Sequence, residues 1–310
     1  MTEFRHVPVL LGECLAGLDI RPEGVYVDGT LGGGGHAFEI AKRLTTGLLI
    51  GIDRDETALR AAGERLAPFG ERVKLVRSNF DRLGEVLDAL GIPLADGLLF
   101  DLGVSSPQLD DAGRGFSYMA DAPLDMRMDR ESPLTARTVV NEWPEEELRR
   151  ILRDYGEERY AGKIAAAIGK RRERRPIETT LELADLIRDA MPAAARREKQ
   201  HPAKRSFQAL RIAVNDELGS VERMLETAPD RLKPGGRLCV ISFHSLEDRL
   251  VKQAIHRRVD GCTCPKDLPV CVCGFRQTLK TLGGVITASE EELRENPRAR
   301  SAKLRVAQRV

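Results

Sequence analysis

The 310-residue sequence lacks several features that mark whole classes of protein. No apolar run approaches the roughly 18 residues that a membrane-spanning helix requires. The first 18 residues contain two acids and no clean apolar stretch, so they do not resemble a signal peptide. Six cysteines are too sparse for a disulfide scaffold in a chain of this length. We therefore expect a globular protein of the reducing cytoplasm.

The chain also lacks an excess of charge of one sign, because 49 Lys and Arg residues oppose 48 Asp and Glu residues. This balance conceals a regional difference. Residues 1–110 hold 17 acids and 11 bases, whereas residues 163–211 hold 13 bases and six acids. Residues 293–310 add six bases against one acid. Basic stretches indicate a polyanion partner such as nucleic acid, although a charge run is more often a solvated helix face.

Short apolar strands alternate with helical stretches in the first third of the sequence. The strands are predicted at 25–28, 47–52, 73–76 and 97–100, and the helices at 37–44, 57–66 and 83–90. This alternation favours βαβ units and a parallel sheet that is covered on both faces. A helix at 207–225, a turn at 232–236 and a strand at 237–241 continue the pattern later in the chain.

The middle third contains helix signals and no convincing strand. Pro144 stands near a first helical position and is followed by acids, and Thr179 and Glu182 form a capping box. The sequence therefore predicts one sheet domain, 1–109 with 206–310, interrupted by a helical insert at 110–205.

A glycine-rich turn lies between the first strand and its helix, at Asp28–His36 (DGTLGGGGH). Glycines there allow a ligand to approach the backbone amides closely. Asp53 ends the second strand, where a carboxylate can bind both hydroxyls of a ribose. Asp101 ends the fourth strand, so three strands end in an acid along the edge where open α/β sheets bind ligands. These features predict a nucleotide-type ligand.

The turn alone does not identify that ligand. Gly32, Gly34 and Ala37 also fit the dinucleotide fingerprint G-x-G-x-x-A, so an NAD-dependent oxidoreductase agrees with the turn and with Asp53. That function leaves the basic insert unexplained. A non-catalytic RNA-binding protein agrees with the charge but leaves the acid-lined edge without a purpose. S-adenosylmethionine is a third ligand that the glycines do not separate from NAD.

Four of the six cysteines form two C-x-C pairs, at Cys262, Cys264, Cys271 and Cys273. Four thiols this close together are typical of a zinc site, although C-x-x-C is the more usual spacing. Such a zinc ion would be structural and would staple a loop; a cluster without metal stays an alternative. Cys14 and Cys239 lie in apolar segments and are expected in the core.

The sequence also contains motifs that are longer than a general nucleotide-binding sheet requires. They are His6–Leu11 (HVPVLL), Asp28–His36 (DGTLGGGGH), Asp101–Gln108 (DLGVSSPQ), Gly115–Ser117 (GFS), Pro123–Asp129 (PLDMRMD), His201–Arg211 (HPAKRSFQALR), Ile241–Arg249 (ISFHSLEDR) and Asn296–Ser301 (NPRARS). Together they closely resemble the bacterial 16S ribosomal RNA cytosine-N4 methyltransferase family, also called MraW or RsmH. The resemblance covers nearly the whole chain.

This resemblance implies an S-adenosylmethionine-dependent enzyme that methylates the exocyclic N4 amine of one cytidine in the decoding region of 16S rRNA. It implies an α/β class I methyltransferase fold, with a Rossmann-like, mostly parallel sheet and a helical substrate-recognition insert. The basic insert and the C-terminal tail would then bind 16S rRNA or the small ribosomal subunit. No membrane partner is expected, and the oligomeric state is left open, with a dimer as one option.

The resemblance also assigns site residues by position. Cofactor contacts are expected at Gly34, Gly35, His36, Asp53, Phe80, Asp101 and Gln108. Phe80 would offer an apolar face to adenine, although an apolar residue after a strand is usually core. Methyl transfer also needs acceptors for the N–H groups of the amine. Many amino-methyltransferases place an acid or amide, two prolines and an aromatic after the fourth strand, and this chain departs from that pattern. The candidate catalytic groups are therefore Asp101, Ser105, Ser106, nearby backbone carbonyls and, as a general base, His244.

Overall fold

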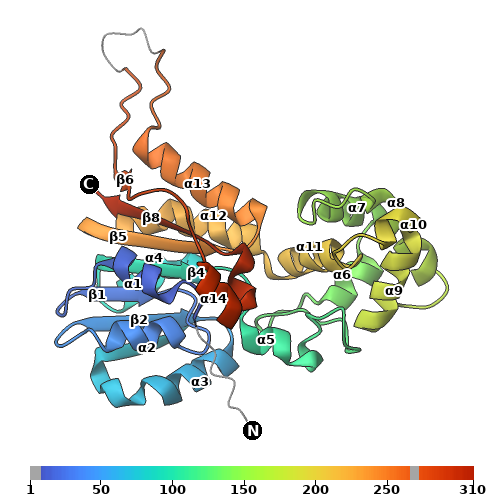
Figure 1. The fold of residues 1–310 in the computed structure, drawn as a ribbon, viewed down its shortest axis with the longest axis horizontal. Coiled ribbons are helices and arrows are strands. Elements are labelled where there is room, and N and C mark those ends of the chain that lie inside the picture. The colour runs from blue at the N-terminus through green and yellow to red at the C-terminus, as the bar shows by residue number, and fades with distance from the viewer. Residues whose placement is uncertain (1–7, 266–271) are drawn as a thin grey trace. The chain divides into compact units, whose positions relative to one another are not determined.

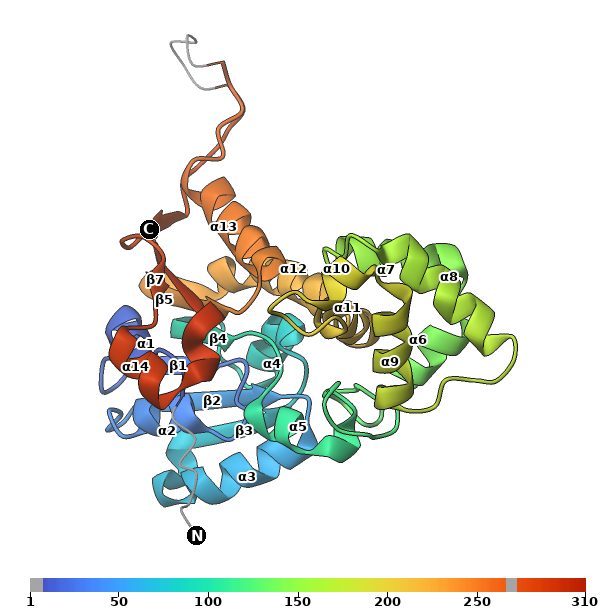
Figure 2. The same ribbon diagram turned by 45° about the vertical axis from the view of Figure 1, so that its right-hand side comes forward.

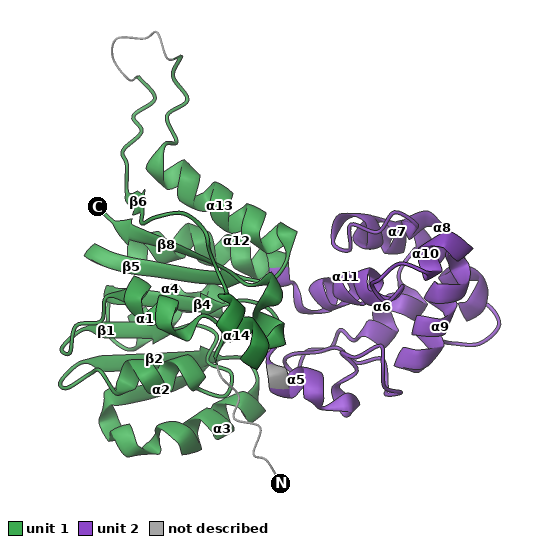
Figure 3. Ribbon diagram, viewed as in Figure 1, with its two compact units in different colours: residues 1–103, 218–310 green, residues 104–217 purple. Residues whose placement is uncertain are grey.

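The computed structural model of the protein describes residues 8–265 and 272–310. Two compact units make up the chain, residues 1–103 with 218–310 and residues 104–217 (Figure 3). The second unit therefore begins earlier and ends later than the insert expected at 110–205. No helix within the described ranges is both long enough and apolar enough to cross a membrane.

One sheet forms the centre of the first unit (Figure 1). Its strands in the described residues are β1 (Val25–Asp28), β2 (Leu48–Asp53), β3 (Val73–Arg77), β4 (Ala95–Asp101), β5 (Leu232–Ser242), β6 (Leu279–Thr281), β7 (Ile286–Thr287) and β8 (Lys303–Arg309). The spatial order is β3-β2-β1-β4-β5-β8-β6, and β7 also pairs with β8. The pairs from β3 to β5 are parallel, whereas β8 runs antiparallel to its neighbours. The predicted, mostly parallel Rossmann-like sheet is thus confirmed.

Both faces of this sheet are buried, because successive side chains of a strand point to opposite sides. Val27 and Ile50 lie in one apolar cluster, whereas their neighbours Tyr26 and Leu49 lie in the other. The first cluster also contains side chains of α4 (Leu83–Ala89), α12 (Glu217–Thr227) and α13 (Ser245–Val259). The second contains side chains of α1 (Leu11–Leu18), α2 (Gly35–Ala41) and α3 (Glu56–Leu66). This arrangement explains the continuous apolar runs of the predicted strands.

The rest of the first unit consists of short elements. They are α14 (Glu290–Glu295) and the 3₁₀ turns η1 (Ala67–Arg72), η2 (Phe80–Arg82), η4 (Ala228–Arg231) and η5 (Pro297–Ser301). Between α13 and β6 the described chain on either side of residues 266–271 runs away from the sheet in both views (Figures 1 and 2). Most of its side chains there are exposed.

The second unit is helical. Its elements are α5 (Ser106–Asp110), η3 (Ala112–Arg114), α6 (Ala136–Glu142), α7 (Glu145–Asp154), α8 (Ala161–Arg172), α9 (Thr180–Ala190), α10 (Ala193–Arg196) and α11 (Lys204–Asn215). Its one strand-like contact among described residues is an isolated bridge between Pro123 and Thr179. The predicted start of α9 is confirmed, because Thr179 is its N-cap and its side chain accepts from the N–H of Glu182, while Glu182 Oε2 accepts from the N–H of Glu178. Phe116 and Phe207 are buried in the core of this unit.

Three local predictions differ from the structure. The helix predicted at 207–225 is two helices, because Asp216 adopts a left-handed conformation (φ 47°) that ends α11. The turn predicted at 232–236 belongs to β5, where the register against β4 shifts and Gly235 has a φ of 82°. The C-terminal stretch, expected as a basic tail, includes β8 of the sheet. Lys303 and Arg305 of β8 both pair with Asp248.

Candidate active site

Three aspartates end neighbouring strands at the carboxyl edge of the sheet. Asp28 is the last residue of β1, Asp53 of β2 and Asp101 of β4. From β1 the chain continues to β2 and β3 on one side of β1, and then crosses to β4 and β5 on the other side. The strand order therefore reverses between β1 and β4. Such a switch point is where open α/β sheets bind their ligands. The structure therefore brings together the three acids that the sequence places after separate strands.

The glycine turn is fixed by hydrogen bonds to both neighbouring strands. The N–H of Gly29 donates to Leu99 O of β4 (2.9 Å), and that of Leu31 donates to Ile52 O of β2 (3.0 Å). Arg65 of α3 donates to Gly33 O (3.1 Å). The turn ends at Gly34, the N-cap of α2, whose φ of 73° strongly favours glycine. Its backbone is therefore rigid at the switch point.

Two adjacent glycines of the turn differ in what surrounds them. A Cβ at Gly35 would lie 2.5 Å from Pro8 Cγ, so packing within the protein already requires glycine there. A Cβ at Gly33 would meet no atom within 4 Å. The space beside Gly33 is thus open, as expected where a ligand lies against the backbone.

Asp53 is oriented by backbone donors. Its Oδ2 accepts from the N–H of Gly32 and its Oδ1 from the N–H of Asp55, both at 2.8 Å. Burial raises the pKa of Asp53 above its usual range, and these two donors oppose the shift. Each carboxylate oxygen keeps a further lone pair, so the fixed side chain can still accept from a diol.

Asp28 and Asp101 form a pair of carboxyl groups that resist ionisation. Asp28 is 1% exposed, and burial raises its pKa to about 7. Burial also raises the pKa of Asp101 to about 8, and the negative charges of Asp28 and Glu247 add to the shift. Asp101 is therefore largely protonated at neutral pH.

Asp101 has one oxygen without a partner. Its Oδ1 is buried and accepts no hydrogen bond within the part of the chain that the structure describes. Its Oδ2 lies 4.0 Å from Nδ1 of His36. The Nε2 of His36 lies 3.0 Å from Val9 O, so in the neutral ring Nε2 donates and Nδ1 presents a lone pair toward Asp101. The expected cofactor residue His36 is thus buried behind Asp101.

Phe80 follows β3 in η2, at the same edge of the sheet. Its ring is partly buried and contacts Phe100 edge-on, with the centroids 6.0 Å apart. The preceding residue, Asn79, was missed by the sequence analysis. Its Nδ2 donates to Ser220 Oγ (2.9 Å), while its Oδ1 is buried without a partner among the described residues. A sequence does not show that only one end of an amide side chain has a hydrogen-bond partner.

Ser105, Ser106 and Gln108 belong to the second unit. Ser105 is the N-cap of α5, and its N–H donates to Oε1 of the buried Gln108 (3.1 Å). This contact holds the start of α5. The side chain of Ser106 lies outside the described parts.

His244 caps helix α13. Its Nδ1 accepts from the N–H of Glu247 (3.4 Å), and Glu247 Oε2 accepts from the N–H of Phe243 (2.8 Å). The Nε2 of His244 lies 3.1 Å from Glu247 Oε1 but is not aligned as a hydrogen bond. Both ring nitrogens of His244 therefore face groups in the first turn of α13.

The cysteines divide as expected between core and loop. Cys14 and Cys239 are fully buried. Cys262, Cys264 and Cys273 lie in the exposed chain between α13 and β6, with their sulfur atoms within 4.8 Å of one another. Cys271 lies outside the described residues.

Several arginines of the basic stretch 163–211 have structural partners. Arg172 donates to the carbonyls of Val140 (2.9 Å) and Trp143 (2.8 Å). Arg171 donates to Arg175 O (2.7 Å) and lies 3.7 Å from Glu182. In contrast, four exposed cations in α8 and in the turns next to it make no ion pair or side-chain hydrogen bond within the described residues: Arg159, Lys163, Lys170 and Arg174.

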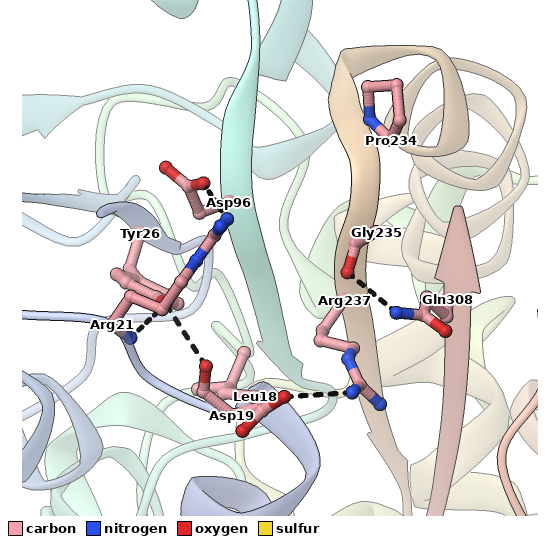
Figure 4. A pocket seen from close by; sticks show the side chains of 9 residues that line it. All are labelled: Leu18, Asp19, Arg21, Tyr26, Asp96, Pro234, Gly235, Arg237 and Gln308. Atoms are coloured by element: carbon pink, nitrogen blue, oxygen red, sulfur yellow. Dashed lines mark hydrogen bonds and ion pairs between the residues drawn. The ribbon is translucent and has the colours of Figure 1, made fainter. Parts of the chain in front are cut away.

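A pocket lies at the opposite, amino end of the strands (Figure 4). Its lining consists of Leu18, Asp19, Arg21, Tyr26, Asp96, Pro234, Gly235, Arg237 and Gln308. Arg21 pairs with Asp96, and Arg237 pairs with Asp19 (2.9 Å). Because these charges compensate one another within the pocket, they do not indicate a charged ligand.

Comparisons with known proteins identify the family. The model of the MraW methylase family matches residues 3–310. Proteins named ribosomal RNA small subunit methyltransferase H are 59% identical in Symbiobacterium thermophilum (97% of this chain, 96% of that protein) and 58% identical in Heliobacterium modesticaldum (99% of each chain). A solved rRNA methylase from Streptococcus thermophilus, 11% identical with a TM-score of 0.43 (97% of this chain, 95% of that chain), is too dissimilar to add to this. The chain belongs to the MraW methylase family.

Proposed function

We propose that this protein transfers a methyl group from S-adenosylmethionine to the N4 amine of a specific cytidine in the decoding region of 16S rRNA. The shared name of its relatives supports small-subunit rRNA as the substrate class. The observation that carries the proposal is the carboxyl edge, where three strand-ending aspartates surround a rigid glycine turn in a chain of a methylase family. Because the proposed substrate belongs to the small ribosomal subunit, the reaction would take place in the cytoplasm.

The ribose of the cofactor would be bound by Asp53. Its carboxylate is held by two backbone N–H groups, and each oxygen can accept a further hydrogen bond from a hydroxyl. The open space beside Gly33 would admit the cofactor against the turn, at the backbone of Gly34 and Gly35. The buried His36 would act indirectly, by holding Asp101. The role of Gln108 would include holding the start of α5.

The adenine would lie at the end of β3. Phe80 offers part of its ring to an aromatic base. Asn79 has an amide end that is buried without a partner, and leaving such a group unpaired costs about 1–3 kcal/mol. The exocyclic amine of adenine is a hydrogen-bond donor that Oδ1 of Asn79 can accept. We therefore add Asn79 to the expected cofactor residues.

Asp101 is the group that we favour at the reacting centre. When bound, S-adenosylmethionine supplies a methyl group on a positively charged sulfur. A positive charge next to Asp101 would lower its pKa and return the carboxyl to its ionised form. Its unpartnered Oδ1 could then accept an N–H of the amine, which must lose one proton as the new N–C bond forms. Ser105, Ser106 and His244 stay as alternative acceptors.

The rRNA would be bound by the cations along α8. Lys163 and Lys170 are seven residues apart and share one face of α8 (Ala161–Arg172), and Arg159 and Arg174 lie in the turns directly before and after the helix. The opposite face of α8 is in the core through Ile164 and Ile168. Unpaired cations in a row can neutralise successive phosphates. We call Arg159, Lys163, Lys170 and Arg174 the α8 row.

Zinc has no part in this reaction. The cysteine pairs lie in the chain after α13, and a zinc ion there would be a structural cross-link. It is a separate proposal with its own test. In the C-terminal stretch, Lys303 and Arg305 both pair with Asp248, which holds their side chains but balances only one of the two charges.

The experiment that tests the proposed cofactor compares S-adenosylhomocysteine with NAD. We expect the first to raise the melting temperature of the protein and the second to have no effect. Asp53→Ala should weaken the affinity for S-adenosylhomocysteine about 10- to 100-fold, because it removes hydrogen bonds to a charged group. Asp88→Ala is the matched control, since Asp88 is an exposed partner of Arg231. Stabilisation by NAD instead would overturn the proposal.

A further inference from the structure

Three thiols converge in the exposed chain between α13 and β6. The sulfur atoms of Cys262, Cys264 and Cys273 lie within 4.8 Å of one another, and those of Cys262 and Cys273 are 3.7 Å apart. A disulfide bond measures about 2.05 Å, so the latter two are not bonded. Two thiolates that bind one tetrahedral zinc ion at about 2.3 Å are ~3.8 Å apart. The 3.7 Å between Cys262 and Cys273 matches the spacing of two zinc ligands, and the sulfur of Cys264 lies within 4.8 Å of both.

The backbone around these thiols also suits a thiolate. The N–H of Val272 donates to the sulfur of Cys264 (3.3 Å). A donor aimed at sulfur stabilises its negative charge and orients it, as the outer contacts of metal sites do. Gly274, directly after Cys273, has a φ of 71°, which permits the sharp turn of the chain there.

The described residues on either side of 266–271, between α13 and β6, bury little surface of their own. Cys262 and Cys273 are exposed, and the side chain of Val272 is 75% exposed. Ordering a residue costs roughly 1–2 kcal/mol of conformational entropy, which burial normally offsets. Segments without a core commonly obtain this stabilisation from a disulfide or a metal ion.

We propose that Cys262, Cys264 and Cys273 are ligands of a structural zinc ion that stabilises this segment. Thiolates are soft ligands and select zinc over calcium, magnesium or manganese. The fourth cysteine of the pattern, Cys271, lies outside the described residues, and the proposal rests on the other three. The ion cross-links the two sides of the segment and takes no part in methyl transfer.

The first test is the metal content of the full-length protein, purified without a metal-affinity tag and kept reduced. We expect about one equivalent of zinc per chain, falling below ~0.1 in Cys262→Ser/Cys264→Ser/Cys273→Ser. Replacement by Co²⁺ should give the sulfur-to-cobalt absorption of a tetrahedral thiolate site. Thr263→Ala, a change in the same segment that removes no thiol, is the control and should retain the zinc.

The second test separates a structural metal from an incidental one. Removal of zinc by a chelator should speed tryptic cleavage of the segment between residues 257 and 276, while S-adenosylhomocysteine still stabilises the protein. The triple variant should be cleaved equally fast with and without chelator. Substoichiometric zinc in the reduced wild type overturns the proposal. The proposal is also overturned if the protein prepared without reductant contains no metal and has a mass 2 Da lower, because that mass indicates a disulfide.

Discussion

Asp28 and Asp101 are carboxyl groups that folding places where neither ionises easily. Their pKa values rise to about 7 and about 8 because Asp28 is fully buried, Asp101 is largely buried, and both lie near other acids. Such a pair is unfavourable for stability, and a cationic ligand relieves it. The sequence could predict that both residues end strands at one edge, but not that Oδ1 of Asp101 lacks a partner.

The pair makes stability depend on pH in a direction that can be worked out. Between about pH 4 and 8 the folded state keeps protons on these carboxyls that the unfolded chain, with an ordinary pKa of 3.8, has released. Stability must therefore fall as pH rises through this window, by up to about 1.4 kcal/mol per pH unit for each carboxyl. We expect Asp101→Asn to show a shallower fall than wild type in urea denaturation between pH 5 and 8.5. An unchanged slope would contradict the raised pKa, and the exposed Asp88→Asn is the control.

Asn79 yields a prediction about recognition of the base. If its free amide end accepts from the adenine amine, the wild type should bind S-adenosylhomocysteine more tightly than the inosine analogue, which carries a carbonyl in place of the amine. The difference should be about 1–3 kcal/mol, or roughly 5- to 150-fold in Kd. Asn79→Ala should remove the discrimination. Ser220→Ala, which removes the acceptor of Asn79 Nδ2 and leaves Oδ1 in place, should keep it. Calorimetry that shows equal discrimination in wild type and Asn79→Ala would refute the role.

At the scale of elements, buried strands can be predicted from the sequence, whereas the points at which a helix is interrupted cannot. The inner parallel strands β1, β2 and β4 are covered on both faces and therefore appear as apolar runs. The break between α11 and α12 depends on one left-handed residue, Asp216, inside an otherwise helical pattern. The strand β8 was missed because its basic residues suggest a free tail, whereas their partners Asp230 and Asp248 lie in distant parts of the sequence.

The α8 row is an element whose function depends on which cations are unpaired. Charge alone does not distinguish Arg172, which holds two carbonyls, from Arg174, which has no side-chain partner in the described ranges. Lys163→Glu/Lys170→Glu/Arg174→Glu should weaken binding to 16S rRNA and reduce the slope of log K against log salt by about 2–3. The affinity for S-adenosylhomocysteine should not change.

The control for the α8 row alters charge equally elsewhere. Arg60, Lys74 and Lys252 are exposed residues of the first unit, and replacing all three by Glu changes the net charge by the same amount. We expect this variant to keep most of the salt dependence of the wild type. Equal losses in the two variants would show that net charge, and not the row, governs RNA binding.

At the scale of the whole molecule, a net charge of +1 is the sum of an acidic region and a basic region. Residues 1–110, which carry a net negative charge, include the carboxyl edge that would hold a cationic cofactor. The basic stretch 163–211 lies in the helical unit. The sequence predicted this division, the sheet and the three acids. It also predicted that the thiols of the two C-x-C pairs lie close together. It did not predict Asn79 or the α8 row, because each depends on which side chains meet in space.

The measurement that tests the central claim most directly is the identity of the methylated nucleoside. Undermethylated 16S rRNA or small subunits would be incubated with the protein and S-adenosylmethionine, digested to nucleosides and analysed by mass spectrometry against standards. We predict N4-methylcytidine at a single position in the decoding region with the wild type, and a strongly reduced yield with Asp53→Ala. A methyl group on C5 or on a 2′-hydroxyl, or an absence of methylated cytidine, would contradict the account.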